Sequence, residues 1–568
     1  MNIVLALSGD EFRISIPYDP ELVASIKRLP GRTWHKPSKT WRVPASPAAL
    51  DQMRRISKNH DLPLLVEPST VARMEQERQA DERAARIAAT DAIPDGLAVD
   101  YQFRTEPYQH QRAGLAFLQH ARGGGLLWEM GLGKTKTAID YCEWLNEQTV
   151  GRDIRVLVIT PNSVVQNWGE EIEKHAGSTD YALLVAPMTL VNRARMCARK
   201  MYTVTNTEVM SAGPMAKAVL DYEWDVVILD EAHRFKNPRA LRTKNMLKVK
   251  ADRRIILTGT PLTNSPQDLW APLTFVRPGL LGSWWTFQQE YLLRDHFGNV
   301  IGLRAGGEEK LRDKMASIGY RRTKAEVLDL PPKVYEDRHV EMTTAQAQKY
   351  RTMRDELRLE IPDTGDTIVA HSILTQLLRL AQVTAGLYGE GDEYTWDEDS
   401  AKLKELDDLL NTDLAGKSVV IFGLYRRELE ELSKRYEHAN WMPMGPNEGP
   451  GIIYGGVKPA TRQRIINEFQ SGQRRLLFAQ AHSGGIGINL TAAQTAIYYT
   501  RGWSLEDYLQ SQDRLHRIGQ QGTVNIIHLV ATGTIDEQIA KALKAKSDLS
   551  RRITGDAARS LASEVLRR

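Results

Sequence analysis

Residues 126–135 read Leu-Leu-Trp-Glu-Met-Gly-Leu-Gly-Lys-Thr, and this stretch decides the fold class of the chain. An apolar run precedes its two glycines, and a helical pattern through Ala138 and Ile139 follows them. A strand, a glycine loop and a helix in this order are typical of a phosphate-binding loop. Taken alone, the Gly-Leu-Gly-Lys-Thr sequence could also be a flexible turn. Backbone N–H groups of such a loop surround phosphate oxygens at a helix N-terminus. We therefore predict that a nucleotide binds Met130, Gly131, Leu132, Gly133, Lys134 and Thr135, with Lys134 neutralising phosphate charge and the Thr135 hydroxyl binding Mg²⁺.

A second polar group follows another buried strand. Asp230 and Glu231 come directly after Val226-Val227-Ile228-Leu229. An Asp at a strand end is suited to bind Mg²⁺, and the neighbouring Glu to polarise water. A capping pair at a helix start is the simpler alternative, but the two motifs together are far more specific than either alone. Thr258, Gly259 and Thr260 follow a third strand and are candidates for sensing the phosphate state, although an ordinary strand-end turn would look similar.

Residues 510–520 carry two arginines, Arg514 and Arg517, which we expect one helical turn apart on a shared face. One interpretation is a solvated basic stripe. The other is a pair of arginine fingers, because planar cations stabilise the transition-state charge of phosphoryl transfer. If the fingers come from a second domain, hydrolysis requires the two domains to close, as in a motor.

Short apolar runs separated by helical stretches occur twice along the chain, which predicts two α/β domains with parallel sheets. Residues between them look mostly helical, with a polar acidic loop at 386–399, and a charged, Ala-rich stretch near residue 75 indicates a solvated helical linker. The expected organisation is a small α+β domain (1–66), the linker (67–100), a first lobe (101–278), a helical insertion region (279–411), a second lobe (412–540) and a basic C-terminal tail (541–568), either touching DNA or solvated.

The composition is that of an ordinary globular protein: 568 residues, 42% hydrophobic and 26% charged, with a formal charge of +4. This small charge excludes a surface that is positive throughout, so nucleic-acid binding would depend on local patches of basic residues. The two cysteines, Cys142 and Cys197, cannot form a disulfide framework. The first residues lack the pattern of a signal peptide, and no apolar run approaches the roughly 18 residues of a membrane span. We expect a monomer without membrane contact, in the cytoplasm of a bacterial or phage-infected cell rather than in a nucleus.

The order of motifs resembles that of the SNF2 family of superfamily 2 helicase-like ATPases, over about residues 106–539. The resembling segments are 111–114 (Q motif), 160–168 (motif Ia), 230–237 (motif II), 257–264 (motif III), 483–491 (motif V) and 510–520 (motif VI). The resemblance implies two RecA-like lobes with helical insertions, ATP and Mg²⁺ as cofactors and double-stranded DNA as partner. It also implies catalysis by Lys134, Asp230, Glu231, Arg514 and Arg517; nucleotide binding by Gln111, Gly487 and these arginines; coupling by His233, Thr258, Gly259, Thr260 and Gln510; and nucleic-acid binding by Thr160, Asn167, Trp168, Asn264, Ser483, Gly484, Gly485, Asn489 and Trp503.

The activity that the resemblance implies is ATP-driven translocation along double-stranded DNA, or remodelling of DNA and its protein complexes. A strand-separating or annealing helicase and a non-hydrolysing nucleotide-dependent clamp remain alternatives. One departure concerns the second lobe: where the family commonly has Asp before Trp503 and Asn-Pro after it, this chain has Thr500 and Ser504-Leu505.

The N-terminal segment resembles the HARP module of annealing helicases through residues 16–18, 26–32 and 39–44. Alternating apolar residues predict two strands before a helix near residues 21–29. In this segment basic residues alternate with two tryptophans. Such a composition could bind forked or branched DNA, with cations on the backbone and a base stacked on a ring. Equally, the basic residues could form a solvated face over a core that contains the tryptophans. These residues are Arg28, Arg32, Lys36, Lys39, Arg42, Trp34 and Trp41.

Overall fold

The computed structural model divides into two compact units, Met1–Thr323 with Ser550–Arg568, and Lys324–Leu549. In the part of the chain that it describes, no helix is both long enough and apolar enough to cross a membrane. The described residues are 2–29, 31–91, 93, 101–121, 123–184, 200–211, 213–262, 265–296, 298, 300–359, 377–390, 393–437, 450–482, 488–554 and 556.

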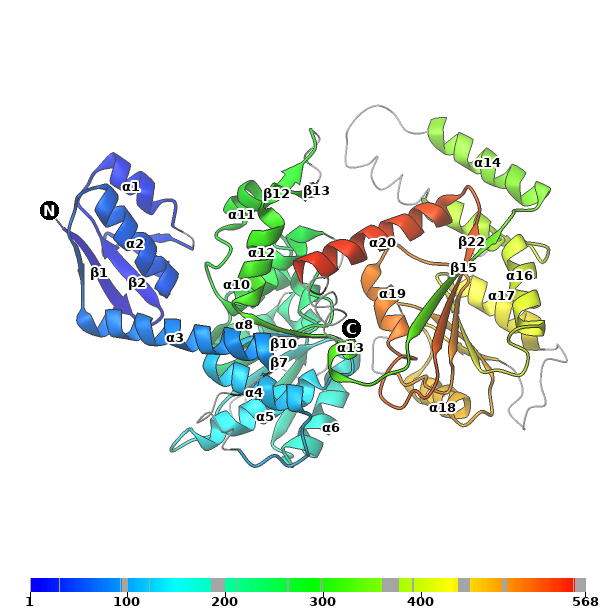
Figure 1. Ribbon diagram of the computed structural model, residues 1–568, viewed down its shortest axis with the longest axis horizontal. Helices are drawn as coiled ribbons and strands as arrows, with labels where there is room; N and C mark the ends of the chain where they lie inside the picture. Colours follow the sequence, from blue (N-terminus) through cyan, green and yellow to red (C-terminus); the bar gives the residue numbers. More distant parts are fainter. Residues whose placement is uncertain are drawn as a thin grey trace, which may run out of the picture. The chain divides into compact units, whose positions relative to one another are not determined.

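The N-terminal module has a five-stranded sheet of order β3-β4-β2-β1-β5 and two helices. Figure 1 shows its strands β1 and β2 with helices α1 and α2, ahead of α3. The two predicted strands are present and pair antiparallel, and inward-facing Ile3, Leu5, Phe12 and Ile14 are buried in the core of the module. Trp41 packs partly against this core, whereas Trp34 remains 46% exposed. The elements are β1 (Ile3–Ser8), β2 (Glu11–Ser15), α1 (Pro20–Ile26), β3 (Thr33–His35), β4 (Thr40–Pro44), α2 (Pro47–Asn59) and β5 (Leu64–Val66).

The expected linker forms a single helix, α3 (Pro68–Thr90), but some of its side chains are buried rather than exposed to solvent. Met74 belongs to the core of the module, and Ala84 and Ile87 further along the helix are also buried. The Arg277 guanidinium donates to both carboxylate oxygens of Asp81, at 2.7 and 3.0 Å. Only the predicted solvation of this linker is wrong, because small residues such as Ala84 pack closely although they carry little hydrophobic signal.

The first lobe is built on a seven-stranded parallel sheet of order β14-β6-β11-β10-β7-β9-β8. Its strands are β6 (Gly123–Trp128), β7 (Val156–Thr160), β8 (Tyr181–Leu184), β9 (Tyr202–Asn206), β10 (Glu223–Asp230), β11 (Lys250–Leu257) and β14 (Gly319–Arg322). The helices are α4 (Gln109–Ala121), α5 (Lys134–Glu147), α6 (Val165–His175), α8 (Pro214–Asp221), α9 (Leu241–Met246), α10 (Trp270–Val276), α11 (Trp284–Tyr291) and α12 (Gly307–Ala316), with the hairpin β12 (Leu292–Arg294) and β13 (Val300–Leu303).

The second lobe has a six-stranded parallel sheet of order β15-β22-β21-β18-β20-β19. Two all-parallel sheets confirm the predicted fold class of two RecA-like lobes. The strands are β15 (Lys333–Val340), β18 (Val419–Gly423), β19 (Gly451–Ile453), β20 (Leu476–Gln480), β21 (Thr495–Tyr498) and β22 (Val524–Ala531). The helices are α13 (Lys324–Val327), α14 (Thr344–Leu359), α16 (Ala401–Asn411), α17 (Arg426–Glu437), α18 (Pro459–Gln470), α19 (Leu505–Gln512) and α20 (Ile535–Ile553), with the hairpin β16 (Leu387–Glu390) and β17 (Glu393–Trp396).

Three boundaries differ from the expectation. The region 279–411 is not a separate helical insertion, because β14 completes the first sheet and β15 the second. The acidic loop at 386–399 contains the hairpin β16–β17. The supposed tail from 541 begins inside α20, where Leu543 is 3% exposed and packs with Ile539. Strands β14, β16 and β17 have only four residues each, too few for their alternation to be recognised.

Candidate nucleotide and nucleic-acid site

The glycine loop joins the end of β6 to the start of α5, as predicted. Gly131 and Gly133 have φ of 81° and 80°, in the left-handed region that glycine adopts without steric cost. A side chain at Gly133 would also collide with Gln111, whose Nε2 would lie 2.2 Å from the added Cβ. The loop therefore needs glycine at this position both for its backbone and for its neighbour.

Gln111 and His110 hold the loop from helix α4. Gln111 Nε2 donates to the carbonyl oxygen of Leu132 at 3.1 Å, and His110 Nε2 lies 2.9 Å from the same oxygen. Burial lowers the pKa of His110, so the neutral ring donates one N–H to this carbonyl. The Lys134 ammonium donates to the carbonyl oxygens of Trp128 at 2.9 Å and Glu129 at 3.3 Å. Lys134 is thus held at the base of the loop.

Asp230 ends β10, and two side chains fix its carboxylate. Thr160 Oγ1 and Trp168 Nε1 each donate to Asp230 Oδ2 at 2.9 Å. Both donors are fully buried, whereas we expected these side chains to contact nucleic acid. The structure differs from that expectation because their polar atoms are used to orient Asp230. Asn167, between them, is exposed.

Glu231 has φ of 48°, which is uncommon for a residue other than glycine. Such backbone strain is concentrated at functional sites. His233 Nδ1 lies 3.5 Å from Glu231 Oε2, so the predicted coupling residue adjoins the predicted catalytic carboxylate. His233 itself is 4% exposed.

The third motif touches the glycine loop directly. A side chain at Gly259 would lie 3.2 Å from the Trp128 carbonyl oxygen and 3.3 Å from the Met130 nitrogen. Thr258 and Thr260 flank it, and the backbone N–H of Thr260 donates to Thr258 Oγ1 at 3.3 Å. Because β11 lies between β6 and β10, the loops after all three strands gather at one edge of the sheet.

Sequence reasoning missed Arg321, on β14. Its Nη1 donates to the carbonyl oxygens of Leu127 at 2.5 Å and Gly259 at 3.1 Å, so one guanidinium joins the strand before the glycine loop to the third motif. Its Nη2 pairs with Asp556 at 2.9 Å and lies 3.9 Å from Glu129 Oε1. The double arginine at 321–322 was a visible signal, but nothing in the sequence placed it beside residue 129.

In the second lobe, the arginines of motif VI are not on a regular helix. Helix α19 ends at Gln512, and Arg514 and Arg517 lie in the turns that follow. Arg514 is 6% exposed and donates to the carbonyl oxygen of Ala481 at 3.2 Å, and burial lowers its pKa to about 10. Arg517 is half-buried, and burial lowers its pKa as well. The predicted shared helical face is therefore wrong, because the helix stops before both arginines.

The remaining predicted residues are distributed as follows. Gln510 Nε2 donates to Glu506 Oε1 at 3.2 Å within α19. Asn489 is exposed, and Trp503 is half-buried with its carbonyl accepting from Lys546 Nζ at 2.6 Å. Five predicted residues lie outside the described part of the chain: Asn264, Ser483, Gly484, Gly485 and Gly487.

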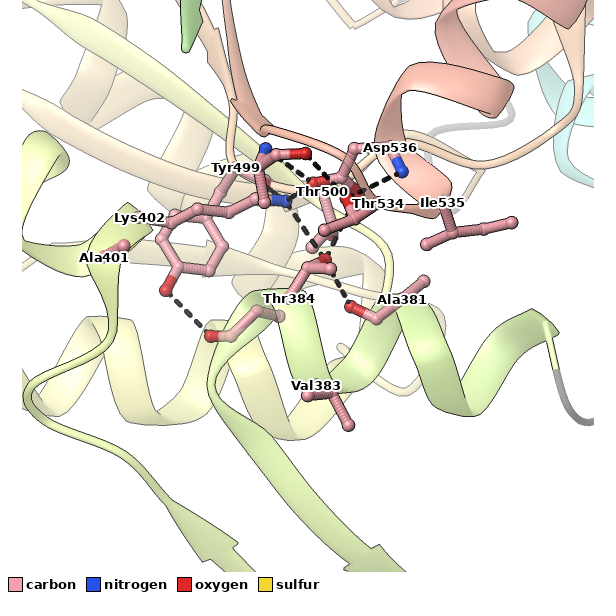
Figure 2. Close-up of polar contacts among 12 residues, drawn as sticks. Ala381, Val383, Thr384, Ala401, Lys402, Tyr499, Thr500, Thr534, Ile535 and Asp536 are labelled. Carbon is pink, nitrogen blue, oxygen red and sulfur yellow. Dashed lines mark hydrogen bonds and ion pairs between the residues drawn. The ribbon is translucent and has the colours of Figure 1, made fainter. Parts of the chain in front are cut away.

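A buried ion pair, also unpredicted, anchors the start of α20 in the second lobe. Lys402 Nζ is 2.7 Å from Asp536 Oδ2 and donates to the Tyr499 carbonyl oxygen at 3.1 Å (Figure 2). Thr384 Oγ1 donates to the other carboxylate oxygen of Asp536 at 3.2 Å. Lys402 is 0% exposed, so this charge is fully compensated by protein groups.

Comparison with known proteins agrees with this arrangement. A model of the SNF2-related domain matches residues 108–387, and one of the helicase conserved C-terminal domain matches residues 401–519. The putative ATP-dependent helicase/translocase YwqA of Bacillus subtilis is 28% identical over 489 residues, covering 82% of this chain and 51% of that protein. Human chromodomain-helicase-DNA-binding protein 1 is 28% identical over 468 residues, covering 77% of this chain and 26% of that protein. The chain thus spans about half or less of the length of these curated relatives.

Among solved structures, the SWI2/SNF2 ATPase core of Sulfolobus solfataricus in complex with dsDNA is 27% identical, with a TM-score of 0.39, covering 80% of this chain and 94% of that one. The two family models together match most of both parallel-sheet lobes, whereas the N-terminal module, β22 and α20 lie outside them. With an SNF2-related domain followed by a helicase C-terminal domain, the chain belongs to the SNF2 family of helicase-like ATPases.

Proposed function

We propose that the chain is an ATP-driven motor that translocates along double-stranded DNA. The observation that carries the proposal is the gathering of Lys134, Asp230 and Gly259 at the carboxyl edge of the first-lobe sheet. In the proposed motor, Arg514 and Arg517 of the second lobe would complete this site when the lobes close. A cycle of ATP binding and release that opens and closes two lobes converts hydrolysis into stepping.

The residues of the first lobe fit a magnesium nucleotide. The N–H groups of residues 131–135 lie at the N-terminus of α5 and suit phosphate oxygens, and Lys134 adds a cation. Thr135 and the oriented carboxylate of Asp230 would hold Mg²⁺, which when bound neutralises charge on the phosphates. Glu231 would orient the attacking water, and Arg514 and Arg517 would stabilise the charge that develops on the transferred phosphoryl group.

Double-stranded DNA is the proposed partner because two matched relatives are named as a helicase/translocase and a helicase-DNA-binding protein. Contacts to phosphates carry no sequence information, so tracking should be largely independent of sequence. Candidate contacts in the two lobes are the exposed Asn167 and Asn489, with Trp503.

The N-terminal module is the proposed determinant of preference for forked or branched DNA. Trp34 is exposed and its ring centroid lies 5.0 Å from that of Trp41, so the pair offers an aromatic surface. Arg28, Lys36 and Lys39 are exposed close by in sequence. Bases stack on aromatic rings while cations follow the backbone, which suits unpaired DNA at a fork.

The test is the rate of ATP hydrolysis without DNA and with single-stranded, duplex and forked DNA at matched salt, since the electrostatic contribution varies steeply with ionic strength. Displacement of a triplex-forming strand then reports translocation. Duplex stimulation with triplex displacement supports the motor. Separation of a duplex into strands would favour a helicase instead, and nucleotide-dependent binding without turnover would favour a clamp.

A further inference from the structure

The end of helix α3 is tied to the strand beside the glycine loop. Asp91, the C-cap of α3, has φ of 55° and presents its carboxylate to β14. Arg322 Nε donates to Asp91 Oδ2 at 2.9 Å, while the Arg322 Nη2 and the Tyr320 hydroxyl both donate to Oδ1. Arg322 Nη1 also donates to the Ala88 carbonyl oxygen in the last turn of α3, at 3.1 Å. We name Asp91, Tyr320 and Arg322 the α3 joint.

The α3 joint is more buried than an ordinary surface ion pair. The Arg322 side chain is 6% exposed, Asp91 25%, and Tyr320 is fully buried. The Arg322 guanidinium also lies over the Tyr320 ring, 4.5 Å from its centroid. Bidentate, charge-assisted hydrogen bonds in such surroundings fix geometry as well as add stability. The carboxyl end of α3 therefore has one defined position on the first lobe.

From the α3 joint, two short routes lead to the glycine loop. Arg322 pairs with Trp128 in the sheet, and its carbonyl accepts from the Glu129 N–H at 3.0 Å, at the first residue of the loop. The Tyr320 ring packs edge-on against Trp128, 5.5 Å between centroids. Trp128 in turn packs against His110 at 5.1 Å, and His110 holds the Leu132 carbonyl in the loop. The first residue of the loop is thus bonded to the joint directly, and Leu132 is connected to it through His110 and Trp128.

The other half of α3 belongs to the N-terminal module. Met74 is buried in the module core, and Arg73 and Arg78 pair with Asp10 at 3.1 Å and with Asp51 at 2.9 Å. A cavity of about 400 Å³ lies between module residues such as Pro47 and first-lobe residues such as Pro278, so the two bodies do not close fully on one another there. Helix α3 is therefore a principal connection between the module and the lobe.

We propose that Asp91, Tyr320 and Arg322 are positioning residues for nucleotide binding, and that they transmit the engagement of the N-terminal module to the glycine loop. The transmission to DNA rests on the proposed function, whereas the effect on the loop does not. Helix α3 is fixed in the N-terminal module at one end and in the first lobe at the other. Because packed contacts deform little, a displacement of the module moves the end of α3 that contacts the lobe.

The first measurement is KM and kcat for ATP without DNA, using full-length Asp91→Asn, Arg322→Lys and Tyr320→Phe. We expect KM to rise between about twofold and thirtyfold, with kcat at saturating ATP changing less. The matched control is Asp51→Asn, which removes the same charge from an ion pair at the module end of α3, away from the α3 joint, and which should leave KM without DNA unchanged. Equal thermal stability of control and variants separates positioning from unfolding.

The second measurement adds duplex and forked DNA and combines Asp91→Asn with Trp34→Ala. If the joint transmits engagement of the module, Trp34→Ala lowers DNA stimulation in the natural chain and has no further effect in the Asp91→Asn chain. If DNA did not stimulate hydrolysis by the natural chain, the proposed function would be wrong. The comparison of KM values for ATP without DNA would still test whether the α3 joint positions the glycine loop. Folded Arg322→Lys and Tyr320→Phe proteins with natural KM, with and without DNA, would overturn the inference even if Asp91→Asn failed to fold.

Discussion

Thr500 Oγ1 lies 2.8 and 3.0 Å from the two carboxylate oxygens of Glu428, which is 0% exposed. The same Thr500 oxygen accepts from the Leu424 N–H at 2.8 Å, so the hydroxyl links Glu428 to the backbone after β18. Burial raises the pKa of Glu428 from 4.5 to about 8, so this carboxyl is largely protonated at neutral pH. The residue that departs from the family pattern is therefore the partner of a buried acid.

Glu428 makes the stability of the second lobe depend on pH. Its pKa is higher in the folded chain than in the unfolded one, so the folded chain holds more protons between about pH 4.5 and 8. The free energy of unfolding should fall as pH rises through this window, by at most about 1.4 kcal/mol per pH unit from this group. Thermal unfolding at pH 5.5 and 8 should show a smaller difference for Glu428→Gln than for the natural chain, with the exposed Glu437→Gln as control.

Thr500→Asp, which restores the family's residue type, should destabilise this chain. A second carboxylate would face Glu428, and two acids at this distance cannot both ionise. We expect a loss of about 2–4 kcal/mol at pH 8, less at pH 5.5, and recovery when Glu428→Gln is added. Unchanged unfolding of Thr500→Asp at pH 8 would refute the pairing.

Lys134→Ala and Glu231→Gln should separate nucleotide binding from hydrolysis. The first removes the cation of the loop, and the second keeps the side-chain shape but removes the carboxylate that we propose orients the attacking water. Both should abolish turnover, while only Lys134→Ala weakens ATP binding strongly. Equilibrium binding of a fluorescent ATP analogue and steady-state hydrolysis are compared with Lys250→Ala, a surface control on β11. Normal hydrolysis by Glu231→Gln would show that another group orients the water.

The loop and both strand-end motifs were predictable because the chemistry of phosphate binding demands particular residues at fixed spacing. The contacts that hold Asp230 were not, since Thr160 and Trp168 are about 60–70 residues away in sequence and meet it only after the sheet has formed. Helix α3 was predicted as a helix, but its docking depends on Asp91 reaching β14 over 200 residues later. Tertiary pairing of this kind leaves no local pattern.

Arg514 and Arg517 should act on the transition state rather than on ground-state binding of ATP. Arg517→Ala should lose DNA-stimulated hydrolysis by about tenfold or more while retaining nucleotide affinity. Because Arg514 is buried against the Ala481 carbonyl, Arg514→Lys is the better test at that position, since it keeps the charge but not the planar guanidinium. If either substitution weakened ATP binding as much as Lys134→Ala with kcat intact, that arginine would belong to the ground-state pocket.

Trp168→Phe should weaken the use of Mg²⁺ without unfolding the first lobe. The substitution keeps a buried aromatic ring but removes the N–H that donates to Asp230 Oδ2. Loss of a group that orients a metal ligand costs roughly 10- to 100-fold in affinity. A titration of hydrolysis rate against Mg²⁺ at saturating ATP should shift to higher concentration, and Trp224→Phe, whose indole donates to the Val219 carbonyl, is the control. An unshifted titration would show that Asp230 is oriented without Trp168.

Lys402 and Asp536 should be strongly coupled in the stability of the second lobe. Removing either partner leaves the other as a buried charge, so Lys402→Met and Asp536→Asn should each destabilise by about 3–5 kcal/mol. The double variant should lose less than the sum, because no uncompensated charge remains. Thr384→Val, which removes only the hydroxyl that donates to Asp536 Oδ1, should cost about 1–3 kcal/mol. Chemical denaturation of the four chains gives the coupling, and additive losses would mean that the two charges are compensated by other groups. Because Asp536 lies in the first turn of α20, the single variants should also expose the start of this helix to hydrogen exchange.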